Sequence, residues 1–184
     1  TEFMLSLTMD PDGAHKLLKK ITDFICEWLA WQKECFPSID GVLILDDIMG
    51  FVGDVEFQEF VLPYFKRIFN ATGSKVRFLH NDADCSSSLK HLPDLGINLF
   101  NMGFDISLNE LKNQTKNKIT MLGNIPPRDV LANGTKEEIE KAVKDLILNL
   151  ENRSRVIISC GGGMPPNVLT ENIKFFEQMV LKYS

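Results

Sequence analysis

The feature that most constrains the fold is a regular alternation of short apolar segments with longer amphipathic ones. Each apolar segment is rich in β-branched or aromatic residues, and none alternates strictly between apolar and polar positions. The five segments are “GVLILDD” (41–47), “VRFLH” (76–80), “INLFNMG” (97–103), “ITMLGN” (119–124) and “RVIISCGGG” (155–163). Strands covered on both faces have this pattern, so the sequence predicts a parallel β-sheet flanked by helices.

Helical signals fill the intervals between these segments. Asp10 stands directly before a proline and predicts the N-cap of a long helix that runs to residue 35. Thr135 and Glu138 have the spacing of a capping box at the start of another helix. Trp28 and Trp31 recur at helical spacing, which predicts that both side chains pack in the core.

Strand and helix alternate along the chain, which places the protein in the α/β class. Two architectures fit, a doubly wound open sheet and a (β/α)8 barrel of the TIM type. A barrel has eight units and usually about 250 residues, whereas this chain shows five units in 184 residues. The sequence therefore predicts either a five-stranded open sheet or part of a barrel. Residue 1 is not methionine and lies in what reads as a folded region, so we expect residues 1–184 to form one domain that lacks an N-terminal part.

Composition excludes several classes of protein. The net charge is −5 and no Lys/Arg-rich run occurs, which argues against a nucleic-acid-binding protein. No apolar run approaches the roughly 18 residues of a membrane span, so no membrane partner is expected. No signal peptide is recognisable, and the four cysteines show no CxxC pair. These features predict a cytoplasmic protein with reduced thiols.

Polar or glycine residues follow each apolar segment. They are Asp46-Asp47, His80-Asn81-Asp82, Asn101, Gly123-Asn124 and Cys160 with Gly161, Gly162 and Gly163. In both architectures the carboxyl ends of parallel strands form the ligand-binding edge. The pattern therefore predicts a binding or catalytic site for a small-molecule substrate at this edge.

The glycine run has more than one reading. Three glycines in succession permit a sharp turn before Pro165 and let the backbone approach a ligand closely. The run matches neither GxGxxG nor a Walker loop, so it does not predict a nucleotide site. Cys160 has no histidine nearby in the sequence, and we predict that it is a buried thiol rather than a nucleophile.

Three long segments resemble the uroporphyrinogen decarboxylase superfamily, which contains decarboxylases of haem biosynthesis and cobalamin-dependent methyltransferases. They are “LDDIMGFVGDVEFQEFVLPYFKRIF”, “TMLGNIPPRDVLANGTKEEIEKAVKDLI” and “VIISCGGGMPPNVLTENIKFFEQMV”. The resemblance covers nearly the whole chain in order. It implies a (β/α)8 barrel of which this chain forms about the last five units.

The two branches of the superfamily differ in their motifs. The decarboxylases have “LGHG” at the last strand end, where this chain reads “SCGGGMPPN” without histidine. They also have a serine where Asp47 stands. The corrinoid-linked methyltransferases bind zinc through a His-x-Cys motif and a later cysteine. His80 matches that histidine, while Asp82 and Gly162 occupy the two cysteine positions. The “GGGMPP” ending is more similar to the methyltransferase branch.

The resemblance therefore favours an enzyme that moves a methyl group between a corrinoid protein and a small acceptor. His80 and Asp82 would hold zinc or polarise the substrate, and Asp46 or Asp47 would act as a general base or support. The expected pocket lining is Asn81, Asn101, Asn124, Gly161, Gly162 and Gly163.

Two alternatives stay open. The first is a uroporphyrinogen decarboxylase of porphyrin biosynthesis, which needs no cofactor. The second is a non-catalytic fragment or partner subunit. Five units of a barrel leave open strand edges at 41–46 and 155–160, and open edges favour pairing with another chain. This reading predicts pairing with the missing N-terminal half or homo-oligomerisation.

Overall fold

The computed structural model describes residues 2–184 and contains one five-stranded parallel sheet. The strands lie side by side in chain order, and each coincides with one of the five predicted segments to within one residue at its C-terminal end or lies inside it. They are β1 (Gly41–Leu45), β2 (Val76–Asn81), β3 (Leu99–Met102), β4 (Thr120–Ile125) and β5 (Val156–Cys160). The prediction of a parallel sheet is confirmed.

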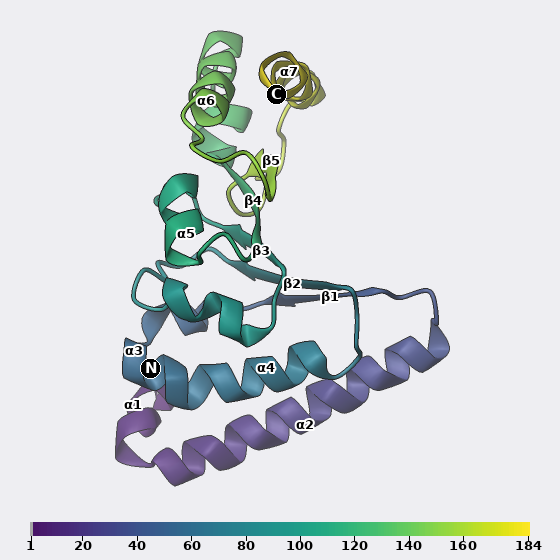
Figure 1. The fold of residues 1–184 in the computed structure, drawn as a ribbon, viewed down its shortest axis with the longest axis vertical. Helices are drawn as coiled ribbons and strands as arrows, with labels where there is room; N and C mark the ends of the chain where they lie inside the picture. The colour runs from purple at the N-terminus through teal and green to yellow at the C-terminus, as the bar shows by residue number, and fades with distance from the viewer. Residues whose placement is uncertain (1) are drawn as a thin grey trace.

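Helices connect the strands and follow the sheet around an open arc, from α2 and α4 beside β1 to α6 and α7 beside β5 (Figure 1). Their bounds are α1 (Glu2–Met9), α2 (Pro11–Cys35), α3 (Asp54–Glu56), α4 (Leu62–Asn70), α5 (Leu108–Gln114), α6 (Lys136–Leu148) and α7 (Thr170–Tyr183). Sequential parallel strands joined by helices are the repeating unit of a (β/α)8 barrel, and this chain forms part of such a barrel.

The predicted helix starts are confirmed. The Asp10 side chain accepts a hydrogen bond from the backbone N–H of Gly13 at 3.0 Å and begins α2. Thr135 and Glu138 form a reciprocal capping box at the start of α6, in which each side chain accepts a bond from the backbone N–H of the other residue. Both caps satisfy N–H groups that the first helical turn leaves unpaired.

Short 3₁₀ and π segments were not predicted. They are η1 (Ile48–Phe51), η2 (Phe57–Val61), η3 (Leu89–Leu95) and η4 (Pro127–Ala132). The 3₁₀ helix η3 buries Leu89, Leu92 and Leu95 almost completely. Leucines spaced by three residues fall on one side of a 3₁₀ helix, so this spacing is the signal that could have revealed η3.

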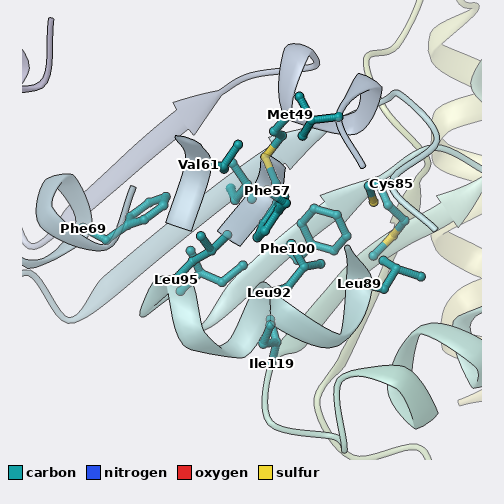
Figure 2. Packing of buried hydrophobic residues seen from close by; sticks show 14 of the residues in the cluster. Met49, Phe57, Val61, Phe69, Cys85, Leu89, Leu92, Leu95, Phe100 and Ile119 are labelled. Carbon is teal, nitrogen blue, oxygen red and sulfur yellow. The ribbon is translucent and has the colours of Figure 1, made fainter. Parts of the chain in front are cut away.

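The main core lies between the sheet and the helices that connect β1, β2 and β3 (Figure 2). Phe57, Phe69 and Phe100 are fully buried there, and η3 contributes its leucines from one side. A second, smaller cluster joins α6 and α7 to the end of β4. Both clusters pack on the face of the sheet that is turned to the helices. They therefore hold in place the strands whose carboxyl ends carry the polar residues.

The prediction that Trp28 and Trp31 belong to the core is wrong. Their side chains are 46% and 52% exposed and contact each other, with ring centroids 5.0 Å apart. The long helix α2 packs on α4, and it buries Ala14 and Thr22 on a different stripe of its surface. Helical spacing identified an apolar stripe but not the face that α2 turns to the core.

No helix within residues 2–184 combines the length and the apolar character that a bilayer crossing requires.

We expect the isolated 1–184 chain to self-associate. β1 and β5 are edge strands with unpaired backbone groups, and large apolar side chains on or near them are exposed, namely Leu43, Leu45, Phe51 and Ile157. An exposed apolar edge strand is a template for pairing with another chain. Light scattering after size-exclusion chromatography should show oligomers, and Leu45→Lys should reduce them. A monodisperse monomer with cooperative unfolding would contradict this prediction.

Candidate functional site

The strand register places His80 and Asn101 side by side on one face of the sheet. The residues directly opposite one another in the five strands are Leu45, His80, Asn101, Leu122 and Ile157. Successive side chains of a strand point to opposite faces, and the neighbouring row with Leu79, Phe100 and Met121 is buried in the core. The row with His80 therefore faces away from the helices, toward the inside of the barrel.

Asn101 holds the His80 ring. Asn101 is 5% exposed, and its amide nitrogen donates to the carbonyl oxygens of Leu122 at 2.5 Å and Cys160 at 3.3 Å. Its amide oxygen lies 2.7 Å from His80 Nδ1. An amide oxygen only accepts, so Nδ1 carries a hydrogen. The other ring nitrogen, Nε2, is the one available for proton exchange or ligand binding.

The Asp82 carboxylate lies against that free nitrogen. Its Oδ2 is 3.3 Å from His80 Nε2, and the His80 side chain is largely buried while Asp82 is partly exposed. The backbone N–H of Asp82 donates to Asp47 Oδ1 at 2.7 Å, which connects the loops after β1 and β2. The predicted pair of His80 and Asp82 is thus brought together, and Asp47 supports its backbone.

Gly162 leaves the space that Asp82 occupies. Its φ is +78°, and a Cβ atom built on it would lie 2.5 Å from Asp82 Oδ1 and 2.7 Å from Oδ2. The backbone conformation favours glycine at this position, and a Cβ atom here would force the Asp82 carboxylate to move. The end of β5 therefore contributes no side chain here, and it packs its backbone against the Asp82 carboxylate.

Asp46 and Asn81 lie at the carboxyl ends of β1 and β2, on the same edge of the sheet. Asp46 Oδ1 accepts from the backbone N–H of Met49 at 3.1 Å, and Asn81 Nδ2 donates to the Asp46 carbonyl oxygen at 2.8 Å. Burial raises the pKa of the Asp46 carboxyl, more than its bonds to backbone N–H groups lower it. Asn81 is fully buried, and its amide oxygen has no hydrogen-bond donor.

Three predicted lining residues are not brought to His80 by any contact. Asn124 donates to the Ile106 carbonyl oxygen at 2.7 Å and lines a different hollow, of about 450 Å³, between α5 and α6. The backbone of Gly161 packs on Gly103, and nothing lies within 4 Å of a Cβ built on Gly163. In the predicted lining, Asn101 and Gly162 are therefore the residues in contact with the His80–Asp82 pair.

Cys160 is half-buried rather than fully buried, and its Sγ donates to the Gly162 carbonyl oxygen at 3.3 Å. All four cysteines are free thiols, as the spacing predicts.

A cavity of about 280 Å³ adjoins Asp82, and the sequence did not reveal it. Asp82, Asp84 and Asp105 line it together with Met102, Ile106 and Leu111. Asp105 lies two residues after the predicted third strand, so its position just beyond a strand end was the available signal. Polar side chains in the loop after a strand can lie at the same edge of the sheet as the polar residues at the strand end.

Comparison with known proteins supports the predicted resemblance. The family model described as uroporphyrinogen decarboxylase (URO-D) matches residues 1–183. A uroporphyrinogen decarboxylase of Chlorobium limicola is 27% identical over 182 residues, which cover 95% of this chain and 50% of that protein. A uroporphyrinogen decarboxylase of Danio rerio is 26% identical and is covered to 48%. The chain spans about half the length of the curated relatives it matches.

A solved structure has the same fold. A methyltransferase from Methanosarcina mazei superposes with a TM-score of 0.84 at 17% sequence identity. The superposition covers 98% of this chain and 52% of that protein, as expected for part of a barrel. With the family model matched along residues 1–183, the chain belongs to the uroporphyrinogen decarboxylase family.

Proposed function

We propose that the full-length protein is an enzyme of the methyltransferase-like branch of this family. It moves a methyl group between the corrinoid of a partner protein and a small acceptor. The observation that carries the proposal is the His80–Asp82 pair at the end of β2, which faces the bare backbone of Gly162 at the end of β5. A histidine at the last strand end, as in the decarboxylases, is absent from this arrangement.

In this proposal His80 exchanges a proton with the small substrate through Nε2. Asn101 keeps the hydrogen on Nδ1 and fixes the ring. Asp82 stabilises the positively charged ring when Nε2 is protonated, because their atoms are 3.3 Å apart. A positioned histidine with a carboxylate beside it is a common general acid and base near neutral pH.

The described residues do not complete a zinc site. A catalytic zinc ion has three protein ligands and one open position, while His80 and Asp82 supply two ligands. Within residues 2–184, no group of three or more His, Cys, Asp or Glu side chains could hold a metal ion. The proposed proton exchange at His80 needs only its Nε2 atom and the neighbouring Asp82 carboxylate.

A uroporphyrinogen decarboxylase is the second candidate, because curated relatives at 23–27% identity have that name. Two features of the site count against it. Asp47 stands where the decarboxylases have serine, and it binds the Asp82 backbone. Gly162 has no room for a histidine while Asp82 keeps its position.

The two candidates are separated by assaying the full-length protein in both reactions. We expect anaerobic demethylation of methylcobalamin with 2-mercaptoethanol, followed as the appearance of cob(I)alamin absorbance. We expect no loss of carboxyl groups from uroporphyrinogen, followed by chromatography of the oxidised products. Decarboxylation without methyl transfer would contradict the proposal and establish the second candidate.

Asp46 suits a supporting or general-base role because its pKa is raised from 3.8 by burial. A carboxyl whose pKa is higher in the folded than in the unfolded protein stabilises the fold at pH values below its unfolded-state pKa. This stabilisation is lost as the pH rises through its folded-state pKa. Asn keeps an acceptor for the Met49 N–H. We therefore expect Asp46→Asn to increase the free energy of unfolding of the full-length protein at pH 7 but not at pH 4. Urea denaturation at both pH values tests this, and equal differences would contradict it.

A further inference from the structure

The long helix α2 carries an apolar stripe on an exposed side. Five of its side chains are between 46% and 66% exposed; they are Leu17, Ile21, Phe24, Trp28 and Trp31. The exposed Cys35 continues the stripe to the end of the helix. Single exposed apolar residues are common on protein surfaces, whereas a continuous apolar stripe marks an interaction surface. We call these six residues the α2 seam.

The spacing within the α2 seam has the period of a helix–helix contact. The intervals between its successive members are alternately four and three residues. This is the heptad pattern of a coiled coil, in which apolar side chains of one helix fill the holes on the surface of another. The α2 seam therefore fits an amphipathic helix better than a strand or a small ligand.

The helix α4 lies on the opposite side of α2 from the seam. His15 Nδ1 is 2.7 Å from the hydroxyl oxygen of Tyr64 in α4, and Lys33 Nζ donates to the carbonyl oxygen of Thr72, just after α4, at 2.7 Å. At about 100° per residue, His15 and Lys33 fall on one side of α2 and the seam falls roughly opposite. One flank of α2 is thus covered by α4 (Figure 1), and the seam is the other flank.

The two remaining sides of α2 differ in character. The core-facing side is buried or partly buried and contains Ala14, Leu18, Thr22 and Leu29. The outer side is exposed and charged and contains Lys16, Lys20, Glu27 and Glu34. The α2 seam therefore borders the core-facing side and faces along the wall of the barrel rather than outward.

The position of α2 in the barrel indicates what lies along this flank. The helices of a (β/α)8 barrel form a ring around the strands, so each helix has a neighbour on both flanks. The neighbour on one flank is α4, which follows β1. β1 is an edge of the described sheet, and the chain covers only 48–50% of its curated relatives. The flank with the seam is therefore the place of the unit that comes before β1 in such a relative.

We propose that the α2 seam binds an amphipathic helix of the βα unit that precedes residue 1 in the full-length protein. The charges beside the seam describe this partner helix. Lys20 calls for an acidic side chain opposite it, and Glu27 and Glu34 call for basic side chains further along. The alternative occupant is a second copy of the chain, which fits less well because the seam lies in the barrel wall. The inference goes beyond the proposed function and does not depend on the reaction.

Photo-cross-linking of the full-length protein tests this contact directly. The photoreactive residue p-benzoylphenylalanine replaces Phe24, the most exposed member of the α2 seam. We expect cross-links within one chain to a peptide that precedes residue 1, identified by mass spectrometry after digestion. The same photoreactive residue in place of Lys16, on the outer side of α2, is the matched control and should give no such cross-link.

A pair of substitutions tests how much the contact contributes to folding. Phe24→Glu places a carboxylate in the helix contact, so we expect it to lower the Tm of the full-length protein by at least about 5 °C. Lys16→Glu places the same side chain on the outer side of α2 and should change the Tm by less than about 2 °C.

Three cross-linking results would overturn the inference: links between two copies, links only to residues 1–184 of the same chain, and no links from position 24. Equal Tm values for the two glutamate variants would overturn it as well.

Discussion

His80→Ala is expected to lower the rate of methyl transfer by the full-length protein about 10²- to 10⁴-fold, the usual contribution of a general acid or base. The variant removes the ring nitrogen that faces Asp82 and leaves the Asn101 amide oxygen without its donor. A buried unpaired acceptor costs about 1–3 kcal/mol, so a modest fall in the free energy of unfolding accompanies the loss.

A second variant separates catalysis from stability. His80→Gln retains an amide that can donate to Asn101 but cannot exchange a proton at neutral pH. We expect it to fold better than His80→Ala and to be as inactive. His15→Gln is the matched control, because His15 lies on α2, bonded to Tyr64, away from the strand ends. Full activity of either His80 variant would show that His80 has no part in the reaction.

Gly162→Ala is expected to lower the rate about 100-fold, because small displacements of a catalytic group cost this much. The new Cβ would lie 2.5 Å from Asp82 Oδ1, so the carboxylate has to move relative to His80 Nε2. The positive φ of +78° adds a backbone cost of about 1–2 kcal/mol for alanine. Steady-state kinetics should show the loss in kcat, and thermal unfolding should show a lower Tm.

The adjacent glycine gives the control for this effect. Nothing lies within 4 Å of a Cβ on Gly163, so Gly163→Ala should retain activity. If Gly162 acts through Asp82, the double variant Gly162→Ala with Asp82→Asn should be no slower than Asp82→Asn alone. Additive losses in this cycle would indicate that Gly162 affects the rate by another route.

Local sequence accounts for most of the secondary structure. Apolar runs without alternation identified all five strands, because strands covered on both faces need apolar residues at successive positions. The caps at Asp10 and Thr135 were recognisable because they involve residues three apart. η3 was missed because its leucines have the period of a 3₁₀ helix and not of an α-helix.

Tertiary structure decided which polar residues form the site. Asn101 and Asn124 both stand at a strand end, yet Asn101 holds His80 while Asn124 binds the loop after β3. Trp28 and Trp31 formed a recognisable stripe, and the packing of α2 on α4 left that stripe exposed.

The sequence alone determined the alternation of strands and helices along the chain, the edge on which the polar residues lie, and the pairing of His80 with Asp82. These follow from the covalent order of strand and helix and from residues two apart in one strand end. Only the tertiary structure decided that Gly162 packs against Asp82 and that Asp105 joins it at one cavity. Those contacts join separate strands, and their geometry depends on register and backbone conformation, which no local pattern specifies.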